Sequence, residues 1–262
     1  MFRCERPSSL YSLRHAGLFI IGIIALTCAD MLQAAETELS PETFSLHLGA
    51  TRIFYDPDKK GTLLTVNNNQ DYPMLVQSKV LSENLKSPAP FVITPPLFRL
   101  DGGQSSSLRI IRTGGEFPSD RETLQWVCVK GIPPTEEDQW AKNSNTGKSI
   151  NNKVSLKVQF SINSCIKLFV RPRDVRGNST DAASSVSWQR IGRKLKGTNP
   201  TPFYVNLSEV TIGGYKVNMK PPYIAPFSSV EFDMPNNASG DIQWKIINDY
   251  GGISKPFKEK TK

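Results

Sequence analysis

The chain has 262 residues, of which 38% are hydrophobic and 21% charged, and its formal net charge is +8 at pH 7. This hydrophobic share supports a folded core and excludes a wholly disordered chain. No apolar run reaches the roughly 18–20 residues that span a bilayer, which excludes a multi-pass membrane protein. The basic residues are dispersed along the chain, so we do not expect nucleic acid as a partner.

Residues 1–35 are typical of a removable export signal. Basic residues precede an unbroken apolar stretch over residues 16–26 (AGLFIIGIIAL), and Ala34 and Ala35 supply small residues for cleavage. Cleavage after Ala29 is an alternative, and an uncleaved N-terminal anchor is another. We expect the exported chain to begin near residue 36.

The cysteines indicate an oxidising compartment. Of the four, Cys4 and Cys28 lie within the predicted signal, which leaves Cys128 and Cys165. An even pair in an exported protein predicts a disulfide, and two reduced buried thiols are the alternative. Closing a loop of about 38 residues would stabilise the fold by roughly 4 kcal/mol in the chain-entropy model.

The rest of the chain has the pattern of an all-β protein, with short apolar or alternating segments separated by Pro, Gly and Asn clusters. The first group of predicted strands comprises residues 52–55, 62–66, 73–80, 91–94, 107–112 and 124–130. The second comprises residues 185–190, 203–211, 215–219, 229–232 and 242–248. Pro172 ends a strand between the groups. We therefore predict two immunoglobulin-like β-sandwich domains, residues 36–171 and 172–262.

Residues 154–162 alternate strictly between apolar and polar side chains. The large apolar residues are Val154, Leu156, Val158, Phe160 and Ile162. A strand places all five on one face. The segment is longer than a typical strand of about 5–6 residues and follows a long polar segment, residues 132–153. Because exposed apolar edge strands are normally blunted, we favour a strand that pairs with another chain over an ordinary core strand.

Several short motifs, in this order and spacing, resemble the periplasmic chaperones of chaperone–usher fibre assembly. They are residues 51–55 (TRIFY), 91–100 (FVITPPLFRL), 120–124 (DRETL), 166–172 (IKLFVRP), 204–207 (YVNL), 224–229 (IAPFSS) and 247–252 (INDYGG). The cysteine pair and the long segment before the alternating strand resemble the subfamily that serves thin fibres, capsule-like coats and afimbrial adhesins.

This resemblance implies a periplasmic protein whose two domains enclose a cleft. Its partners would be fibre or adhesin subunits and an outer-membrane usher. Such subunits are incomplete sandwiches that lack a final strand, and the chaperone lends residues 154–162 to fill the groove. The family motifs place Arg52 and Lys167 as the two cations that bind the subunit's C-terminal carboxylate. Self-association through the edge of the donor strand is a further expectation.

The resemblance also assigns residues outside the binding strand. Glu122, Arg171 and Asp249 match positions of an interdomain charge network, which would hold the two domains at a fixed angle. At the N-terminus, Phe44, Leu46 and Leu48 alternate with polar residues. This segment is expected to form an extra strand beside the donor strand, and a frayed terminus is the alternative.

The sequence gives little support for catalysis. After residue 35 only His47 remains as a histidine, so no zinc site is expected. Neither a nucleophile elbow nor a phosphate-binding glycine loop is present. We expect no catalytic residue, cofactor or metal. The alternative to a chaperone is a secreted two-domain adhesin or ligand-binding protein in which residues 154–162 form internal core.

Overall fold

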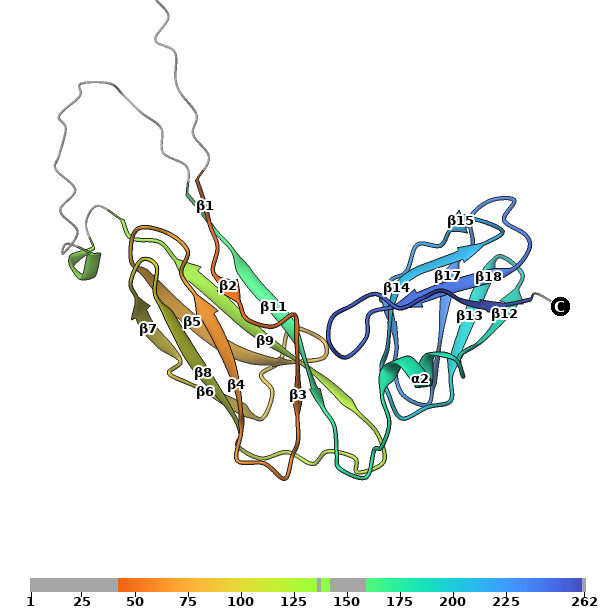
Figure 1. Cartoon of the computed structure of the whole chain (residues 1–262), viewed down its shortest axis with the longest axis horizontal. Coiled ribbons are helices and arrows are strands. Elements are labelled where there is room, and N and C mark those ends of the chain that lie inside the picture. Colours follow the sequence, from red (N-terminus) through yellow and green to blue (C-terminus); the bar gives the residue numbers. More distant parts are fainter. Residues whose placement is uncertain (1–41, 136–137, 142–158, 261–262) are drawn as a thin grey trace, which may run out of the picture. The chain divides into compact units, whose positions relative to one another are not determined.

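The computed structural model describes residues 42–135, 138–141 and 159–260 (Figure 1). All of them belong to one compact unit. The predicted signal and the donor-strand residues Val154, Leu156 and Val158 lie outside the described residues. Apart from two short helices the described elements are strands, which confirms the all-β prediction.

The strands before residue 171 form the first sandwich. They are β1 (Glu42–Phe44), β2 (His47–Leu48), β3 (Arg52–Tyr55), β4 (Thr62–Asn67), β5 (Met74–Ser82), β6 (Phe91–Thr94), β7 (Leu97–Leu100), β8 (Ser105–Arg112), β9 (Thr123–Ile132), β10 (Gln159–Ser161) and β11 (Asn163–Val170). A five-stranded sheet has the order β3-β11-β9-β5-β7, and a four-stranded sheet has the order β2-β4-β8-β6. Strands β1 and β10 form a separate pair. A short 3-10 helix, η2 (Gln139–Ala141), follows β9.

The core of the first sandwich lies between its two larger sheets. Alternate residues of β4 and β8, such as Leu64 and Leu108, are buried against Val127, Val129 and Leu168 of β9 and β11. This two-residue period is what a sheet with one buried face requires. The opposite face of β9 and β11 is therefore left to carry other side chains.

The second sandwich begins after a short helix, α2 (Ser179–Ala183), that the side chain of Asn178 caps. Its strands are β12 (Ser187–Ile191), β13 (Lys194–Asn199), β14 (Val205–Ile212), β15 (Tyr215–Lys216), β16 (Tyr223–Ile224), β17 (Ser228–Asp233), β18 (Ile242–Ile246) and β19 (Phe257–Glu259). One sheet has the order β12-β13-β17, and the other the order β15-β14-β18-β19, with β16 also paired to β14. Trp188, Leu195, Phe232 and Trp244 are buried between them.

The N-terminal strands pair with the last strands of the first sandwich. Strand β3 runs parallel to β11, with Arg52 opposite Lys167, and β1 runs parallel to β10, with Thr43 opposite Phe160. The N-terminal segment therefore forms a strand beside β10 over residues 42–44 only; of the alternating residues, Leu46 packs in the core and Leu48 belongs to β2, which pairs with β4.

A disulfide links β9 and β11, two neighbouring strands of the five-stranded sheet. Cys128 of β9 and Cys165 of β11 lie directly opposite each other, with their Cα atoms 4.0 Å apart. The bond lies two residues before Lys167 along β11, so it ties together the strands that carry this lysine and its neighbour Trp126.

Candidate functional site

Arg52 and Lys167 lie side by side on the five-stranded sheet, because β3 and β11 pair in parallel with these two residues opposite each other. Lys167 also lies opposite Trp126 of β9. The structure thus brings together the two cations that the resemblance assigns to a carboxylate. Both side chains reach residues of the second sandwich.

The Lys167 ammonium is enclosed by residues of both sandwiches. Its Nζ donates a hydrogen bond to Oδ1 of Asn206 at 2.5 Å. The same atom lies 4.7 Å from the ring centroid of Tyr223 and 5.8 Å from that of Trp126. Burial, together with the positive charge of Arg52, lowers the pKa of Lys167 to about 8, and the carboxylate of Glu83 acts in the opposite direction. An ammonium has three donors, and the bond to Asn206 is the only one that Lys167 makes among the described residues, which leaves two for a ligand.

The Arg52 guanidinium is also only partly satisfied. Its Nη1 donates to the backbone oxygen of Ile247 at 3.2 Å. Its Nε is buried and has no hydrogen-bond partner among the described residues. Burial lowers the pKa of Arg52, and the charge of Asp249 opposes this effect. Buried donors without acceptors are costly, so this pair of cations suits an anion with two oxygens, such as a carboxylate.

Arg171 joins the two sandwiches through two carboxylates. Its Nε donates to Oε1 of Glu122 at 2.5 Å, and its Nη1 donates to Oδ2 of Asp249 at 2.8 Å. Glu122 also accepts the backbone N–H of Tyr204, and Asp249 accepts the hydroxyl of Ser179. The structure thus places the three residues of the predicted network in direct contact.

The network is buried, which makes it energetically important. The Glu122 side chain is 1% exposed and that of Arg171 is 19% exposed. Burial raises the pKa of Glu122, against the lowering effect of Arg171. Burial alone would lower the pKa of Arg171, but its bonds and charge pairs with Asp249 and Glu122 raise it. The Arg171 guanidinium also stacks on Phe54, 4.2 Å from the ring centroid. The stability of such a buried network depends on every member keeping its hydrogen-bond partners.

Replacing Arg171 with alanine is expected to lower the free energy of unfolding by roughly 3 kcal/mol, because it leaves the buried Glu122 carboxylate without a counter-ion and takes one cation from the half-buried Asp249. Urea denaturation at pH 7 measures this loss. Arg173→Ala is the matched control, since Arg173 pairs with Asp56 and Asp58 while its own side chain is 64% exposed. The control should cost less than about 1 kcal/mol. Equal losses in the two variants would contradict a structural role for the network.

The described part of the predicted donor strand is short. Strand β10 contains Phe160, and Ile162 follows it with 39% of its surface exposed. The hydroxyl of Ser161 donates to the backbone oxygen of Gly131 at 2.5 Å, which attaches β10 to β9. Within the described residues, the only strand that pairs with β10 is β1.

The partners of the two cations were missed in the sequence. Asn206, Tyr223 and Ile247 all belong to the second sandwich, and nothing in their local pattern points to residues of the first. The only available signal was that Asn206 and Ile247 fall within motifs shared with the family, residues 204–207 and 247–252.

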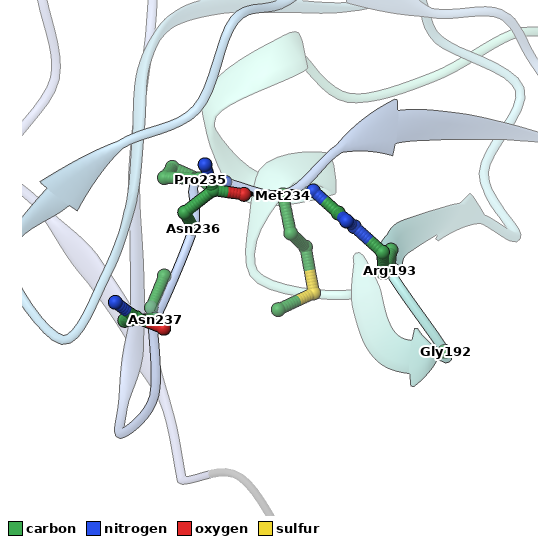
Figure 2. Close-up of a pocket in the computed structure, with 7 residues that line it drawn as sticks. Gly192, Arg193, Met234, Pro235, Asn236 and Asn237 are labelled. Atoms are coloured by element: carbon green, nitrogen blue, oxygen red, sulfur yellow. Dashed lines mark hydrogen bonds between the residues drawn. The ribbon is translucent and has the colours of Figure 1, made fainter.

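Other features of the surface lie apart from this site. A pocket of about 280 Å³ in the second sandwich is lined by Arg193, Met234 and Asn236, with Arg193 Nη2 bonded to Asn236 Oδ1 at 2.7 Å (Figure 2). None of the predicted site residues lines it. Across the ranges that the structure describes, no group of three potential metal-ligating side chains is present. No helix in these ranges is long and apolar enough to cross a membrane.

Comparison with known proteins covers both sandwiches. Residues 45–176 match the family described as "Pili and flagellar-assembly chaperone, PapD N-terminal domain", and residues 181–258 match "Pili assembly chaperone PapD, C-terminal domain". The chaperone protein AfaB of Escherichia coli is 61% identical over 220 residues, which cover 84% of this chain and 88% of AfaB.

Two solved structures of other chaperones are similar to this chain over both sandwiches. The E. coli chaperone DraB has a TM-score of 0.73 and 60% identity, covering 86% of this chain and all of DraB. The Salmonella enterica SafB chaperone, solved in complex with the SafA pilin, has a TM-score of 0.73 and 46% identity, covering 85% of this chain. With two matched domains in the expected order and relatives of this similarity, the chain belongs to the PapD family of pilus-assembly chaperones.

Proposed function

We propose that this protein is a periplasmic assembly chaperone, which captures incomplete fibre or adhesin subunits and passes them to an outer-membrane usher. The donor strand, residues 154–162, would fill the subunit's groove, and Arg52 and Lys167 would bind its C-terminal carboxylate. The observation that carries the proposal is the pair of adjacent, half-buried cations, of which Arg52 has a buried Nε without a hydrogen-bond partner among the described residues. Support also comes from SafB, a relative that was solved with a pilin bound.

The strand edges beside the cations suit an added strand. Strand β11 pairs with β9 along its whole length, but β3 pairs only with residues 167–170 of β11. Among the described residues, the second edge of residues 163–166 is unpaired and leads directly to β10. A subunit strand added at this edge would gain main-chain hydrogen bonds, while alternate side chains set its register. If the subunit strand ended beside Lys167 of this chain, its C-terminal carboxylate would lie at the two cations.

Subunit binding is expected to weaken at alkaline pH. The free ammonium of Lys167 has a pKa of about 8, so it is charged at pH 7 and mostly neutral at pH 9. Because a carboxylate binds the charged form, the Kd should rise about tenfold between these pH values. Tyr223, whose pKa burial raises to about 12, stays neutral across this range.

Isothermal titration of a purified subunit at several pH values would measure this dependence. Lys167→Arg is the matched control, since a guanidinium remains charged at pH 9. The variant should bind with little change over the same range. An identical pH profile in the two proteins would show that another group is responsible.

The proposed function is tested by co-expressing the tagged chain with the secreted subunits of its own system. We expect a small β-rich subunit to co-purify from the periplasm, and we expect subunit levels to fall when the chaperone gene is deleted. The usher is tested by cross-linking the complex in outer membranes. Recovery of the tagged chain outside the cell, with unchanged subunit levels in the deletion strain, would favour a secreted adhesin instead.

A further inference from the structure

We infer that Asn206, a residue of the second sandwich, positions the Lys167 ammonium for the subunit's carboxylate. The inference rests on the proposed function and adds a positioning residue to it. Its basis is that both cations come from the first sandwich, yet each is hydrogen-bonded to the second. Lys167 donates to Asn206, and Arg52 donates to the backbone of Ile247.

A second hydrogen bond, made by the nitrogen of the Asn206 amide, fixes the orientation of the amide group. Its Nδ2 donates to the backbone oxygen of Tyr204 at 3.3 Å, which turns Oδ1 toward Lys167. An amide oxygen is an acceptor, so it suits an ammonium, whereas the Nδ2 end would repel it. The residue is 3% exposed, and bulk water therefore offers little competition for this bond.

The backbone that carries Asn206 is held on both sides. It lies in β14 opposite Tyr223 of β16, and its own carbonyl accepts the N–H of Ile247 at 2.8 Å. The ring of Tyr223 in turn packs beneath the ammonium. The amide therefore presents its oxygen from a fixed position, and one short region of the second sandwich contacts both cations.

The absence of charge on the Asn206 side chain is as important for carboxylate binding as its position. A neutral acceptor takes up one of the three ammonium donors without cancelling the positive charge, and it leaves two donors for the ligand. An aspartate of the same shape would pair with Lys167 and compete with the incoming carboxylate. Replacing the amide with a carboxylate should therefore change ligand binding at Lys167 if Asn206 positions the ammonium, and should change it little if Asn206 only fills space.

The test first uses the protein without a subunit. The pKa of Lys167 is followed by NMR of the isotope-labelled lysine side chain in the wild type, Asn206→Asp and Asn206→Leu. We expect Asn206→Asp to raise this pKa by at least about one unit, and Asn206→Leu to lower it. Ser208→Asp, which adds the same charge two residues further along β14, should have a smaller effect. An unchanged pKa in both Asn206 variants, or an equal rise in Ser208→Asp, would overturn the inference.

Acetate serves as the minimal carboxylate probe in the same experiment. In the wild type, acetate should shift the Lys167 side-chain resonances while acetamide should not, and Asn206→Asp should lose at least nine-tenths of this response. A wild-type acetate response retained in Asn206→Asp would overturn the inference. Far-UV circular dichroism establishes that each variant is folded, and Asn206→Leu provides the second variant if the aspartate is not tolerated.

Subunit co-purification separates this inference from the function on which it rests. If Asn206→Asp changes the Lys167 pKa and the acetate response as expected but captures subunits normally, the positioning role holds and the carboxylate clamp of the proposed function fails. If the pKa and acetate responses are unchanged while the wild type still captures subunits, the proposed function holds and the positioning role fails.

Discussion

Arg52→Ala and Lys167→Ala are each expected to weaken subunit binding by roughly a hundredfold while leaving the fold intact. Removing one partner from a buried, charge-assisted contact costs about 2–5 kcal/mol, and a hundredfold loss corresponds to about 3 kcal/mol. Among the described residues each side chain makes a single hydrogen bond, to the second sandwich, so each variant should still fold. Titration of the purified subunit measures the loss, and circular dichroism measures the fold.

Lys79→Ala is the matched control for these two variants. Lys79 lies on the same five-stranded sheet, opposite Cys128, and is exposed. Its removal takes away one positive charge without touching the cation pair, so binding should change less than about threefold if only long-range attraction is lost. A clamp variant that binds like the wild type, or one that unfolds, would argue against the carboxylate role.

Val158→Asp and Phe160→Asp are expected to abolish capture of the subunit. Both residues belong to the apolar face of the alternating segment, and a carboxylate placed in an apolar groove has no partner to offset its desolvation. The expected loss exceeds a hundredfold in Kd and is measured by the same titration. The subunit should also fail to co-purify.

Gln159→Asp tests whether the effect belongs to one face of the strand. Successive residues of a strand point to opposite faces, so this variant adds the same charge next to Phe160 but on the polar side. If the proposed donor strand presents only its apolar face to the subunit, this variant should retain binding within a few-fold of the wild type. Loss of binding in Gln159→Asp as well would show that charge, rather than the apolar face, controls capture.

Most of the longer strands were predictable from local pattern; β7, β13, β16 and β19 were not predicted, and two of these omissions have a clear physical cause. Strand β13 (KLKGTN) was missed because its buried positions are Leu195, Gly197 and Asn199, of which only one is a large apolar residue. Asn199 is buried because its amide donates to three backbone carbonyls, which no apolar pattern signals. Strand β7 was missed because it follows Pro95 and Pro96 directly.

The site was predictable only in part. The resemblance identified Arg52, Lys167 and the three residues of the Arg171 network, and the structure brings each set together. Their contacts with Asn206 and Ile247 depend on how two separately patterned sandwiches meet. Such long-range contacts leave no signal in the spacing of apolar residues, because that spacing indicates only which face of a strand is buried.

The parallel pairing of β3 with β11 also has a consequence for folding order. Arg52 lies near the start of the first sandwich and Lys167 near its end, so this pairing closes a long loop and is the kind of non-local contact that slows folding. The two cations become neighbours only when that closure is complete. A partly folded chain therefore lacks the anion site proposed here, and on that proposal only the finished fold can hold a subunit.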